Sequence, residues 1–468
     1  MSIKQEKCKK IVVVFLLVAL FMSLFTSNLL ASDESTIDKN SVRKRDDIPV
    51  HVFMDELEER ESIAINKYNK LLWTWAYNPK NPSDTNADFP NFYGGSYLDE
   101  KKELVIKVTI LNEEIESYFS EIIDMTNVRF EKVTNSYKEL LDVHKFIFEY
   151  IFLESEQIAD DKILMCISSV DIAQIENAVF LDVYDDKMAE NNITADELIK
   201  HIKDIVASNM DKIYKDVNFI IRPGEGVALF VGTDATKSTI IEPEEEIEEE
   251  YGSSRTLVTL NPGDYIDTNG PYALSVGFWV MDLDNYPYVD IGFITAGHGF
   301  HNNVASLAEV FFDGIGYVTI GSLVDSALGG KLDAAYIKCT STDIVPSWFV
   351  PGHNFYLDPY YYLECDNINL PVGSGVIYKR GATTYNTSGT VQSLSKSGKT
   401  TSGVSYIDFV STNCVGYYGD SGGIVAGGGS WSTRYITGIV AFGDVSTSYI
   451  IFCKASNIFE KWPDLIIY

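Results

Sequence analysis

The sequence predicts two regions of different fold class, an α+β region followed by an all-β region. An acidic run at 242–250 divides the chain of 468 residues. Before it, helical and strand-like patterns alternate, whereas after it the strands are short and turns rich in Gly, Ser and Thr recur about every ten residues. Because a run of like charges repels itself and buries little apolar area, we expect 242–255 to be an exposed acidic linker.

The composition is that of a globular protein, with 46% hydrophobic and 22% charged residues. The formal net charge of −30 argues against binding to nucleic acid or to an anionic membrane surface. The six cysteines contain no CxxC pair, so the sequence indicates no structural zinc site. We expect neither a metal ion nor another cofactor.

The N-terminus has the pattern of a secretory signal peptide. Four lysines precede an apolar run over 11–25, and small residues follow at Ala31 and Ser32. The run is short for a membrane span, which needs about 20 residues. We therefore expect 1–32 to be removed and the remainder to be secreted without stable membrane association, or held at the cell surface if the signal stays uncut.

Upstream of the acidic run, local signals predict individual elements. A helix is expected over 55–77, and Ser136 with Glu139 and Thr194 with Glu197 have the spacing of capping boxes that begin two more helices. Runs rich in β-branched residues predict strands over 104–109, 163–167, 178–183, 219–221 and 227–231, the last two as a pair around a turn at 223–226.

Downstream, the short strands and frequent turns predict a β-barrel or β-sandwich that is closed by a helical stretch over 455–462.

Three short motifs in this downstream part carry the residue types of nucleophilic catalysis. His298 follows an apolar run in Thr-Ala-Gly-His, Asp333 opens another in Asp-Ala-Ala, and Ser421 lies in Gly-Asp-Ser-Gly-Gly. A serine hydroxyl needs a base within hydrogen-bond reach, and an aspartate holds the imidazole of that base in the correct tautomer.

The glycines around Ser421 have a second predicted purpose. They allow the backbone to bend so that the N–H groups of Gly419 and Ser421 point at a developing oxyanion. One such donor is typically worth about 3 kcal/mol of transition-state stabilisation. We therefore expect His298, Asp333 and Ser421 to act together, with Gly419 and Ser421 as the oxyanion hole.

These motifs closely resemble those of the chymotrypsin-like serine proteases, and within them the bacterial streptogrisin and α-lytic protease branch. The resemblance covers about 261–468 and includes Lys-Arg-Gly-Ala-Thr-Thr at 379–384 and the strand Gly-Ile-Val-Ala-Phe-Gly at 438–443. It implies that 256–468 folds as two six-stranded antiparallel β-barrels and hydrolyses peptide bonds of polypeptide substrates as a monomer.

The resemblance extends upstream. The strand-like segments 92–99 and 103–109 are similar to a strand pair in the propeptides of that branch. Those propeptides fold and inhibit their own protease, which implies the same role for 33–241. A spacer or wall-interaction domain is the alternative.

The resemblance also implies a substrate pocket and an ion pair. It places Val415, Ala441, Phe442 and Gly443 beside the substrate, where their apolar character favours an apolar side chain before the cut bond, although the nearby Asp444 leaves a basic side chain open. Asp420 is expected to pair with a basic side chain, which is Lys379 or, alternatively, its neighbour Arg380.

The resemblance does not determine which cysteines form disulfides. Gly299 stands where the family often has a cysteine, so the bond usual beside the histidine is absent. Cys414 with Cys453, and then Cys339 with Cys365, are candidate pairs, and free buried thiols are the alternative.

Two other functions fit parts of the sequence. A non-enzymatic binding protein or adhesin on the same fold would not need all three of His298, Asp333 and Ser421. An esterase of the α/β-hydrolase class requires the order Ser, Asp, His, and this chain has the order His, Asp, Ser. For maturation, Arg255 suits another protease, whereas Leu257 or Leu260 suits self-cleavage.

Overall fold

The computed structural model describes residues 56–76, 89–153, 161–210, 214, 216–224, 226–229, 245–248, 254–283, 289–312, 316–358, 372–373, 377–428, 432–444 and 447–468. The expected signal peptide, 1–32, lies outside these residues. Met54–Tyr468 forms one compact unit. Among the described helices, none is long and apolar enough to cross a membrane. We call the part before residue 242 the N-terminal region and 256–468 the β region.

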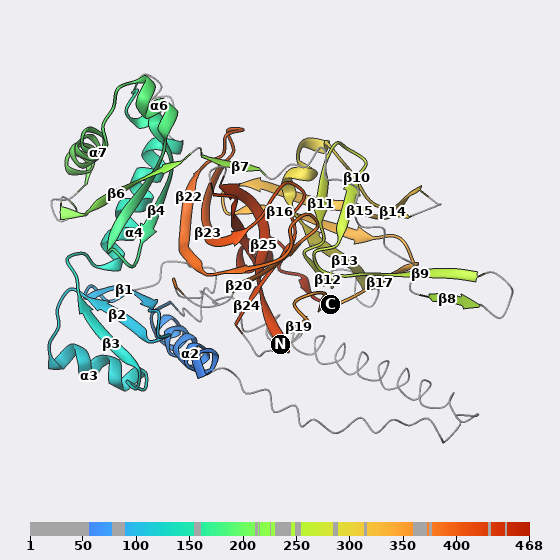
Figure 1. Ribbon diagram of the computed structural model, residues 1–468, viewed down its shortest axis with the longest axis horizontal. Coiled ribbons are helices and arrows are strands. Elements are labelled where there is room, and N and C mark those ends of the chain that lie inside the picture. The colour runs from blue at the N-terminus through green and yellow to red at the C-terminus, as the bar shows by residue number, and fades with distance from the viewer. Residues whose placement is uncertain are drawn as a thin grey trace, which may run out of the picture. The chain divides into compact units, whose positions relative to one another are not determined.

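The N-terminal region begins with a small sheet and two helices (Figure 1). Its elements are α2 (Glu56–Ala76), β1 (Tyr93–Leu98), β2 (Leu104–Val108), α3 (Glu113–Ile122) and β3 (Val128–Lys132). β1 pairs with β2 antiparallel and β2 with β3 parallel. The apolar side of α2, including Leu71 and Trp75, shares one core with Phe119 of α3 and the strands.

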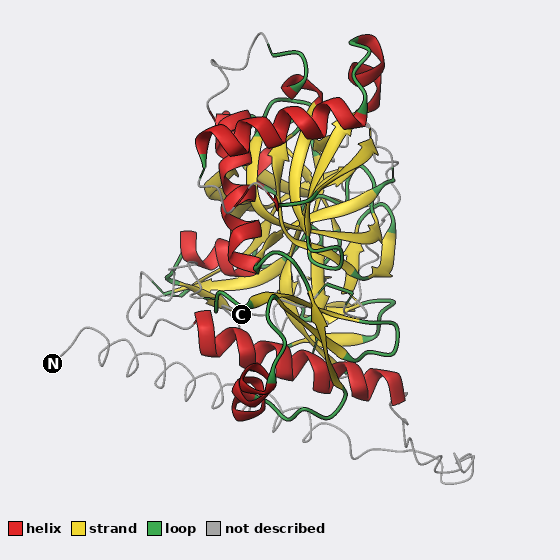
Figure 2. Cartoon of the chain, turned by 90° about the vertical axis from the view of Figure 1, so that its left-hand side faces the viewer, coloured by secondary structure: helices red, strands yellow, loops and turns green. Residues whose placement is uncertain are grey.

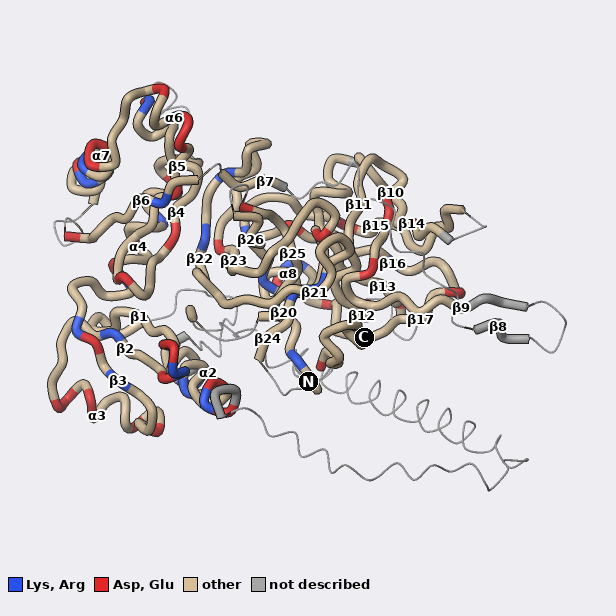
Figure 3. The backbone as a smooth tube through the Cα atoms, viewed as in Figure 1, with Lys and Arg blue, Asp and Glu red and all other residues tan. Residues whose placement is uncertain are grey.

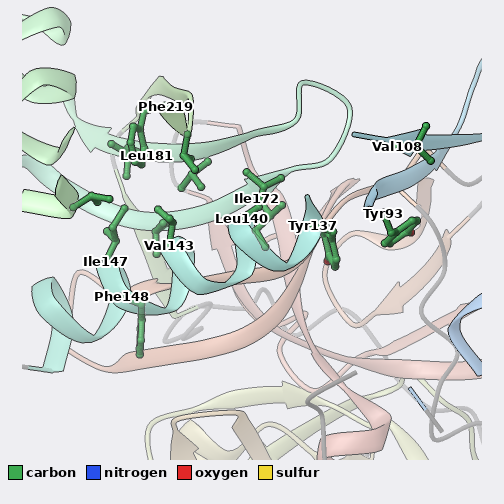
Figure 4. Packing of buried hydrophobic residues seen from close by; sticks show 14 of the residues in the cluster. Tyr93, Val108, Tyr137, Leu140, Val143, Ile147, Phe148, Ile172, Leu181 and Phe219 are labelled. Carbon is green, nitrogen blue, oxygen red and sulfur yellow. The ribbon is translucent and has the colours of Figure 1, made fainter. Parts of the chain in front are cut away.

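The second part of the N-terminal region is another sheet with helices. Its elements are α4 (Tyr137–Phe148), a π-helical turn (Glu149–Leu153), a 3-10 turn (Leu164–Cys166), β4 (Ile167–Ala173), β5 (Ala178–Tyr184), α6 (Asp185–Glu190), α7 (Ala195–Asn209) and β6 (Phe219–Gly224). Figure 4 shows Leu140 of α4 close to Ile172 of β4. Leu140 and Val143 are completely buried in this core.

Local signals located most of these elements correctly. Both predicted capping boxes form, Ser136 with Glu139 at α4 and Thr194 with Glu197 at α7. The predicted strand at 163–167 is wrong, because the Asp161 carboxylate accepts the N–H groups of residues 163 and 164 and begins a helical turn instead. The strand starts only at residue 167.

The first sheet of the β region is antiparallel throughout. It contains β10 (Tyr265–Thr268), β11 (Ala273–Ser275), β12 (Phe278–Asp282), β13 (Asp290–Thr295), β14 (Leu307–Phe312), β15 (Gly316–Gly329), β16 (Leu332–Cys339) and β27 (Leu465–Ile467). Their order is β11-β10-β14-β15-β16-β13-β12-β27. Two 3-10 turns, Gly297–Gly299 and His301–Asn303, follow β13.

The second sheet contains the rest of the long strands. These are β20 (Ile377–Gly381), β21 (Tyr385–Gly389), β22 (Val391–Lys399), β23 (Ser405–Val415), β24 (Ile424–Gly427), β25 (Thr433–Asp444) and β26 (Tyr449–Lys454). Within the β region their order is β21-β20-β24-β25-β26-β23-β22. The short strands β17 (Ile344–Pro346), β18 (Phe349–Val350) and β19 (Phe355–Leu357) connect the sheets, and α8 (Ala455–Lys461) precedes β27.

The predicted fold class is confirmed: an α+β region precedes an all-β region. Except for α8 and short turns, the described helices belong to the N-terminal region (Figure 2). The strand counts differ from the two six-stranded barrels that the resemblance implies, because the first sheet has eight strands and the second sheet extends beyond the β region. A shared core joins the sheets and includes Phe278 and Ile294 of the first and Phe409 and Ile439 of the second.

The acidic run is not a simple linker along its whole length. Residues Glu245–Glu248 form β8, which pairs antiparallel with β9 (Ser254–Leu260). β9 in turn pairs with β17, and Val258 and Leu260 are buried. Leu260, suggested as a self-cleavage site, therefore lies inside the fold of the β region.

The N-terminal region extends the second sheet through β4. In this pairing Ser397 of β22 lies opposite Val170 and Gly398 opposite Ser169. A Cβ atom added to Gly398 would lie 2.6 Å from the Cβ of Ser169, so the close approach of the two strands requires glycine here.

A second contact joins β7 (Val227–Leu229) to β25. Leu229 lies opposite Phe442, Ala228 opposite Gly443 and Val227 opposite Asp444, in antiparallel register. The predicted pairing of 219–221 with 227–231 is therefore wrong: β6 pairs with β5, and β7 with the β region.

A third contact is apolar. Tyr97 and Val105 of the first small sheet share a core with β-region residues that include Val372, Cys414 and Val440. The N–H of residue 98 also donates to the Val372 carbonyl at 2.9 Å.

Charged side chains accompany the β4 to β22 contact. Lys396 of the β region lies 2.6 Å from Asp182, which also binds Arg222 at 2.6 Å. Arg222 reaches Asp171 at 3.3 Å, and the Ser393 hydroxyl donates to Asp171. Most acidic side chains of the N-terminal region lie elsewhere, for example on α3, α6 and α7 (Figure 3). The network has two cations and two anions only when Lys396 takes part.

Burial alone would raise the pKa of Asp182, but Lys396 and Arg222 hold it well below its usual range. A carboxyl with a depressed pKa stabilises the fold above its unfolded pKa of about 3.9, and this stabilisation is lost as the pH falls through the lower folded value. The contact should therefore persist at pH 5 and weaken only in stronger acid.

We predict that Asp182→Asn lowers the free energy of unfolding by about 3 kcal/mol, because it leaves Lys396 buried without its carboxylate. Urea unfolding of the full chain at pH 7 measures the effect. Asp290→Asn is the control, since its ion pair with Lys338 is partly exposed and should be worth under about 1 kcal/mol. Equal losses in the two variants would contradict the prediction.

Candidate active site

Asp333 binds His298 through both carboxylate oxygens. Asp333 is the second residue of β16 and is completely buried, and His298 lies in the 3-10 turn after β13, which pairs with β16. Oδ1 accepts the His298 backbone N–H at 2.8 Å, and Oδ2 lies 2.7 Å from Nδ1. The turn is tightly packed, because a Cβ atom at Gly297 would lie 2.1 Å from the Ala327 carbonyl oxygen.

This arrangement selects one tautomer of the imidazole. Nδ1 carries the proton that it donates to Asp333, so Nε2 has a free lone pair. Nε2 is buried and forms no hydrogen bond with any described residue. The ring of His298 is thus oriented by Asp333, and its Nε2 atom is not used by the fold.

The loop of Ser421 lies against the loop of His298. A Cβ atom on Gly422 would lie 2.3 Å from Thr295 Oγ1 and 2.8 Å from the Ala296 nitrogen, just before the histidine turn. The backbone of Ser421 accepts the Ser275 N–H at 2.7 Å. The structure therefore brings together three motifs that are far apart in the sequence.

The backbone at the nucleophile bends as the glycines suggested. Gly419 and Gly422 have φ angles of 94° and 84°, a region that glycine adopts without strain. Ser421 and Asp420 between them are completely buried. The loop can therefore present the N–H groups of Gly419 and Ser421 on one side.

The Asp420 carboxylate holds the nucleophile loop in place through an ion pair and several hydrogen bonds. Its carboxylate lies 3.0 Å from Lys379 Nζ, and both side chains are completely buried. It also accepts the N–H groups of Thr383, Thr384 and Tyr417 at 2.8, 3.0 and 2.9 Å. The alternative partner, Arg380, instead pairs with Asp264 at 2.8 Å.

The pocket residues lie in different environments. Val415 is 44% exposed, whereas Ala441 and Phe442 are completely buried. The Phe442 ring lies 5.0 Å from that of Phe409 within the core, so Phe442 offers its backbone and not its side chain to a partner strand. The backbone of residues 442–444, including Gly443, pairs with β7.

The candidate bond between Cys414 and Cys453 does not form. Cys414 Sγ donates to the Ile377 carbonyl, and Cys453 Sγ to the Lys331 carbonyl, in two different cores. Burial raises the pKa of Cys414 to about 11, as for an inert thiol. Cys339 is also free, and Cys365 lies outside the described residues.

A leucine explains the missing disulfide beside the histidine. A Cβ atom at Gly299 would lie 2.4 Å from Leu274 Cδ1, so Leu274 fills the space that a side chain at 299 would need. Apolar packing replaces a covalent bridge at this position.

Sequence reasoning missed Ser275, the last residue of β11. It is completely buried and contacts the loops of both His298 and Ser421, through Thr295 and Gly419. A serine at the end of a short strand carries no motif, so only the folded structure identifies it.

Among the described residues, no group of His, Cys, Asp and Glu could hold a metal ion.

Comparison with known proteins gives matches to one domain model and to several solved structures. A family model described as a Pro-like N-terminal domain matches residues 53–133. No curated protein matches the chain. Among solved structures, a glutamic acid specific serine protease with a histidine triad in substrate binding is 20% identical and covers 45% of this chain and 100% of its own, with a TM-score of 0.34. Thermobifida fusca protease A is 18% identical, covers 45% and 98%, and has a TM-score of 0.34.

An α-lytic protease homolog, N4, is 16% identical over 45% of this chain and 100% of its own, with a TM-score of 0.33. The matched domain model lies within the N-terminal region.

We predict that Lys379→Met lowers the free energy of unfolding of the full chain by about 3 to 5 kcal/mol, because it leaves the buried Asp420 carboxylate without its cation. Thermal or urea unfolding measures the change. Lys338→Met, at a partly exposed ion pair, is the control and should cost under about 1 kcal/mol. A Lys379→Met protein as stable as this control would refute a structural role for the pair.

Proposed function

We propose that the protein is a secreted serine endopeptidase made as an inactive precursor. The observation that carries this proposal is the double hydrogen bond of Asp333 to His298, which leaves Nε2 without a hydrogen bond among the described residues, while the loop of Ser421 packs against Thr295 and Ala296. An imidazole held in this tautomer is prepared to accept a proton and to return it.

In the proposed reaction, Ser421 Oγ attacks the carbonyl carbon of a peptide bond while His298 Nε2 takes the hydroxyl proton. The N–H groups of Gly419 and Ser421 stabilise the oxyanion. His298 then gives its proton to the leaving amine, which leaves an acyl-enzyme on Ser421. Water, deprotonated by the same nitrogen, releases the acid and restores the hydroxyl.

The N-terminal region is proposed to inhibit this site. β7 lies antiparallel on residues 442–444, the strand to which the motif resemblance assigns the substrate backbone. Ser421 is completely buried and the His298 side chain is 1% exposed in the full chain. A segment of the chain that occupies the substrate strand excludes polypeptide substrates while it stays there.

The same region is proposed to assist folding. Its three contacts, through β4, β7 and the core around Tyr97, all involve the second sheet of the β region. Sheets with non-local pairing fold slowly because loop closure costs entropy before contacts form. A preformed region that supplies an edge strand and core side chains lowers that cost.

Secretion after removal of 1–32 and action as a monomer complete the proposal. The signal pattern and the net charge of −30 support an exported protein that does not bind anionic surfaces.

We predict that a fluorophosphonate labels the mature protein at Ser421 and that Ser421→Ala abolishes both labelling and peptide hydrolysis. Asp333→Asn should lower kcat by about 10⁴, because it favours the wrong imidazole tautomer. Mass spectrometry and a panel of chromogenic peptides provide the measurements. A folded protein that binds ligands but is not labelled would instead support the non-enzymatic alternative.

We predict that Val227→Asp accelerates fluorophosphonate labelling of the full-length precursor by about tenfold or more. Val227 of β7 is 2% exposed in an apolar core, and a carboxylate buried there weakens the docking of β7. Ile175→Asp, an exposed position of the same region, is the control. Equal labelling rates for both variants and the unchanged precursor would show that β7 does not inhibit.

A further inference from the structure

Ser275 connects the parts of the candidate site through its side chain. Its hydroxyl accepts the Ala382 N–H at 2.9 Å and donates to the Gly419 carbonyl at 2.8 Å. Because one partner takes the lone pair and the other the proton, the orientation of this hydroxyl is determined. Ser275 thereby joins the 382–384 turn, which holds Asp420, to the loop that precedes Ser421.

A second hydroxyl acts on the neighbouring peptide group. Thr383 Oγ1 donates to the Tyr418 carbonyl at 2.6 Å. The two peptide groups that flank Gly419 therefore each have their carbonyl oxygen bound by a hydroxyl, from Thr383 on one side and Ser275 on the other.

These two bonds determine where the Gly419 N–H points. A trans peptide group is planar, and its C=O and N–H point in opposite directions. Binding the Tyr418 oxygen therefore directs the Gly419 N–H away from Thr383, and binding the Gly419 oxygen fixes the next plane. Glycine at φ 94° has little intrinsic preference against rotation of these planes, so the restraint comes from the two hydroxyls and from the Asp420 N–H, which donates to the Tyr417 carbonyl at 3.0 Å.

We propose that Ser275 and Thr383 are positioning residues that keep the Gly419 N–H aimed at the oxyanion. The inference rests on the proposed function, since it concerns the oxyanion hole of that reaction. Neither side chain touches the reacting atoms. Loss of either hydroxyl removes one restraint on these peptide planes, so the transition state loses part of the stabilisation by Gly419 while ground-state binding along β25 is unaffected.

The test compares Ser275→Ala with the unchanged mature enzyme. We expect kcat for a chromogenic peptide to fall about 10-fold to 100-fold with KM nearly constant, below the full loss of one oxyanion donor, about 10² to 10³. The affinity for a peptide boronic acid, whose adduct with serine has an oxygen in the oxyanion hole, should fall by a similar factor. The pH profile of kcat/KM should not shift, because His298 and Asp333 are unchanged.

Ser397→Ala is the matched control. Ser397 is also completely buried, its hydroxyl also accepts a backbone N–H, from Asp408, and it also donates to a backbone carbonyl, that of Ser395. This variant loses the same kind of hydrogen bonds far along the chain from the nucleophile. In the mature enzyme, which lacks the β4 strand that covers Ser397 in the full chain, the variant still loses these two hydrogen bonds and should keep its kcat.

Thr383→Val provides a second variant, since Thr383 is only half-buried and the change preserves its shape. A fall in kcat in both variants, with Ser397→Ala unaffected, supports the proposal. An unchanged kcat in either positioning variant, an equal loss in Ser397→Ala, or a loss confined to KM overturns it. Absence of hydrolysis and labelling in the unchanged enzyme would refute the proposed function instead.

Discussion

The buried Asp420 carboxylate is the interaction on which the nucleophile loop depends. It binds Lys379 and three backbone N–H groups, and the side chains of Asp420 and Lys379 are both completely buried. Removing one partner of a buried ion pair leaves an uncompensated charge in the core. The resulting destabilisation is much larger than the stabilisation that an exposed ion pair provides. The bend at Ser421 is thus maintained by a structure that does not take part in chemistry, and the loop keeps its geometry without a contribution from substrate.

The site also depends on the meeting of two sheets. His298 and Asp333 come from neighbouring strands of the first sheet, and Ser421 precedes β24 of the second. The core between the sheets, with Phe278 on one side and Ile439 on the other, brings these loops together. Ser275 strengthens this meeting, because its strand belongs to the first sheet and its hydroxyl reaches Gly419. The loops of the site therefore come together when the two sheets pack against each other.

Features that depend on residues close together in the sequence were predicted, whereas contacts between residues far apart in the sequence were missed. Capping residues at Ser136 and Thr194 identified helix starts, and the glycines around Ser421 identified the bend, because each effect acts within a few residues. The pairing of β7 with β25 was missed because a strand pattern carries no information on its partner, and a turn-rich segment favoured a hairpin. Ser275 and Lys396 were missed for the same reason: their importance comes only from the residues that the fold places beside them.

Leu274 beside Gly299 has a consequence for the conditions in which this protein can assemble. Side-chain packing fills the position next to the histidine, and Cys166, Cys339, Cys414 and Cys453 carry thiols in separate environments. Assembly at these positions needs no oxidant and no disulfide isomerase, so a reducing compartment or an anaerobic exterior suits this chain as well as an aerated one. At this position van der Waals contact takes the place of a cross-link, so we expect temperature and solvent composition, more than redox potential, to affect the stability of the fold here.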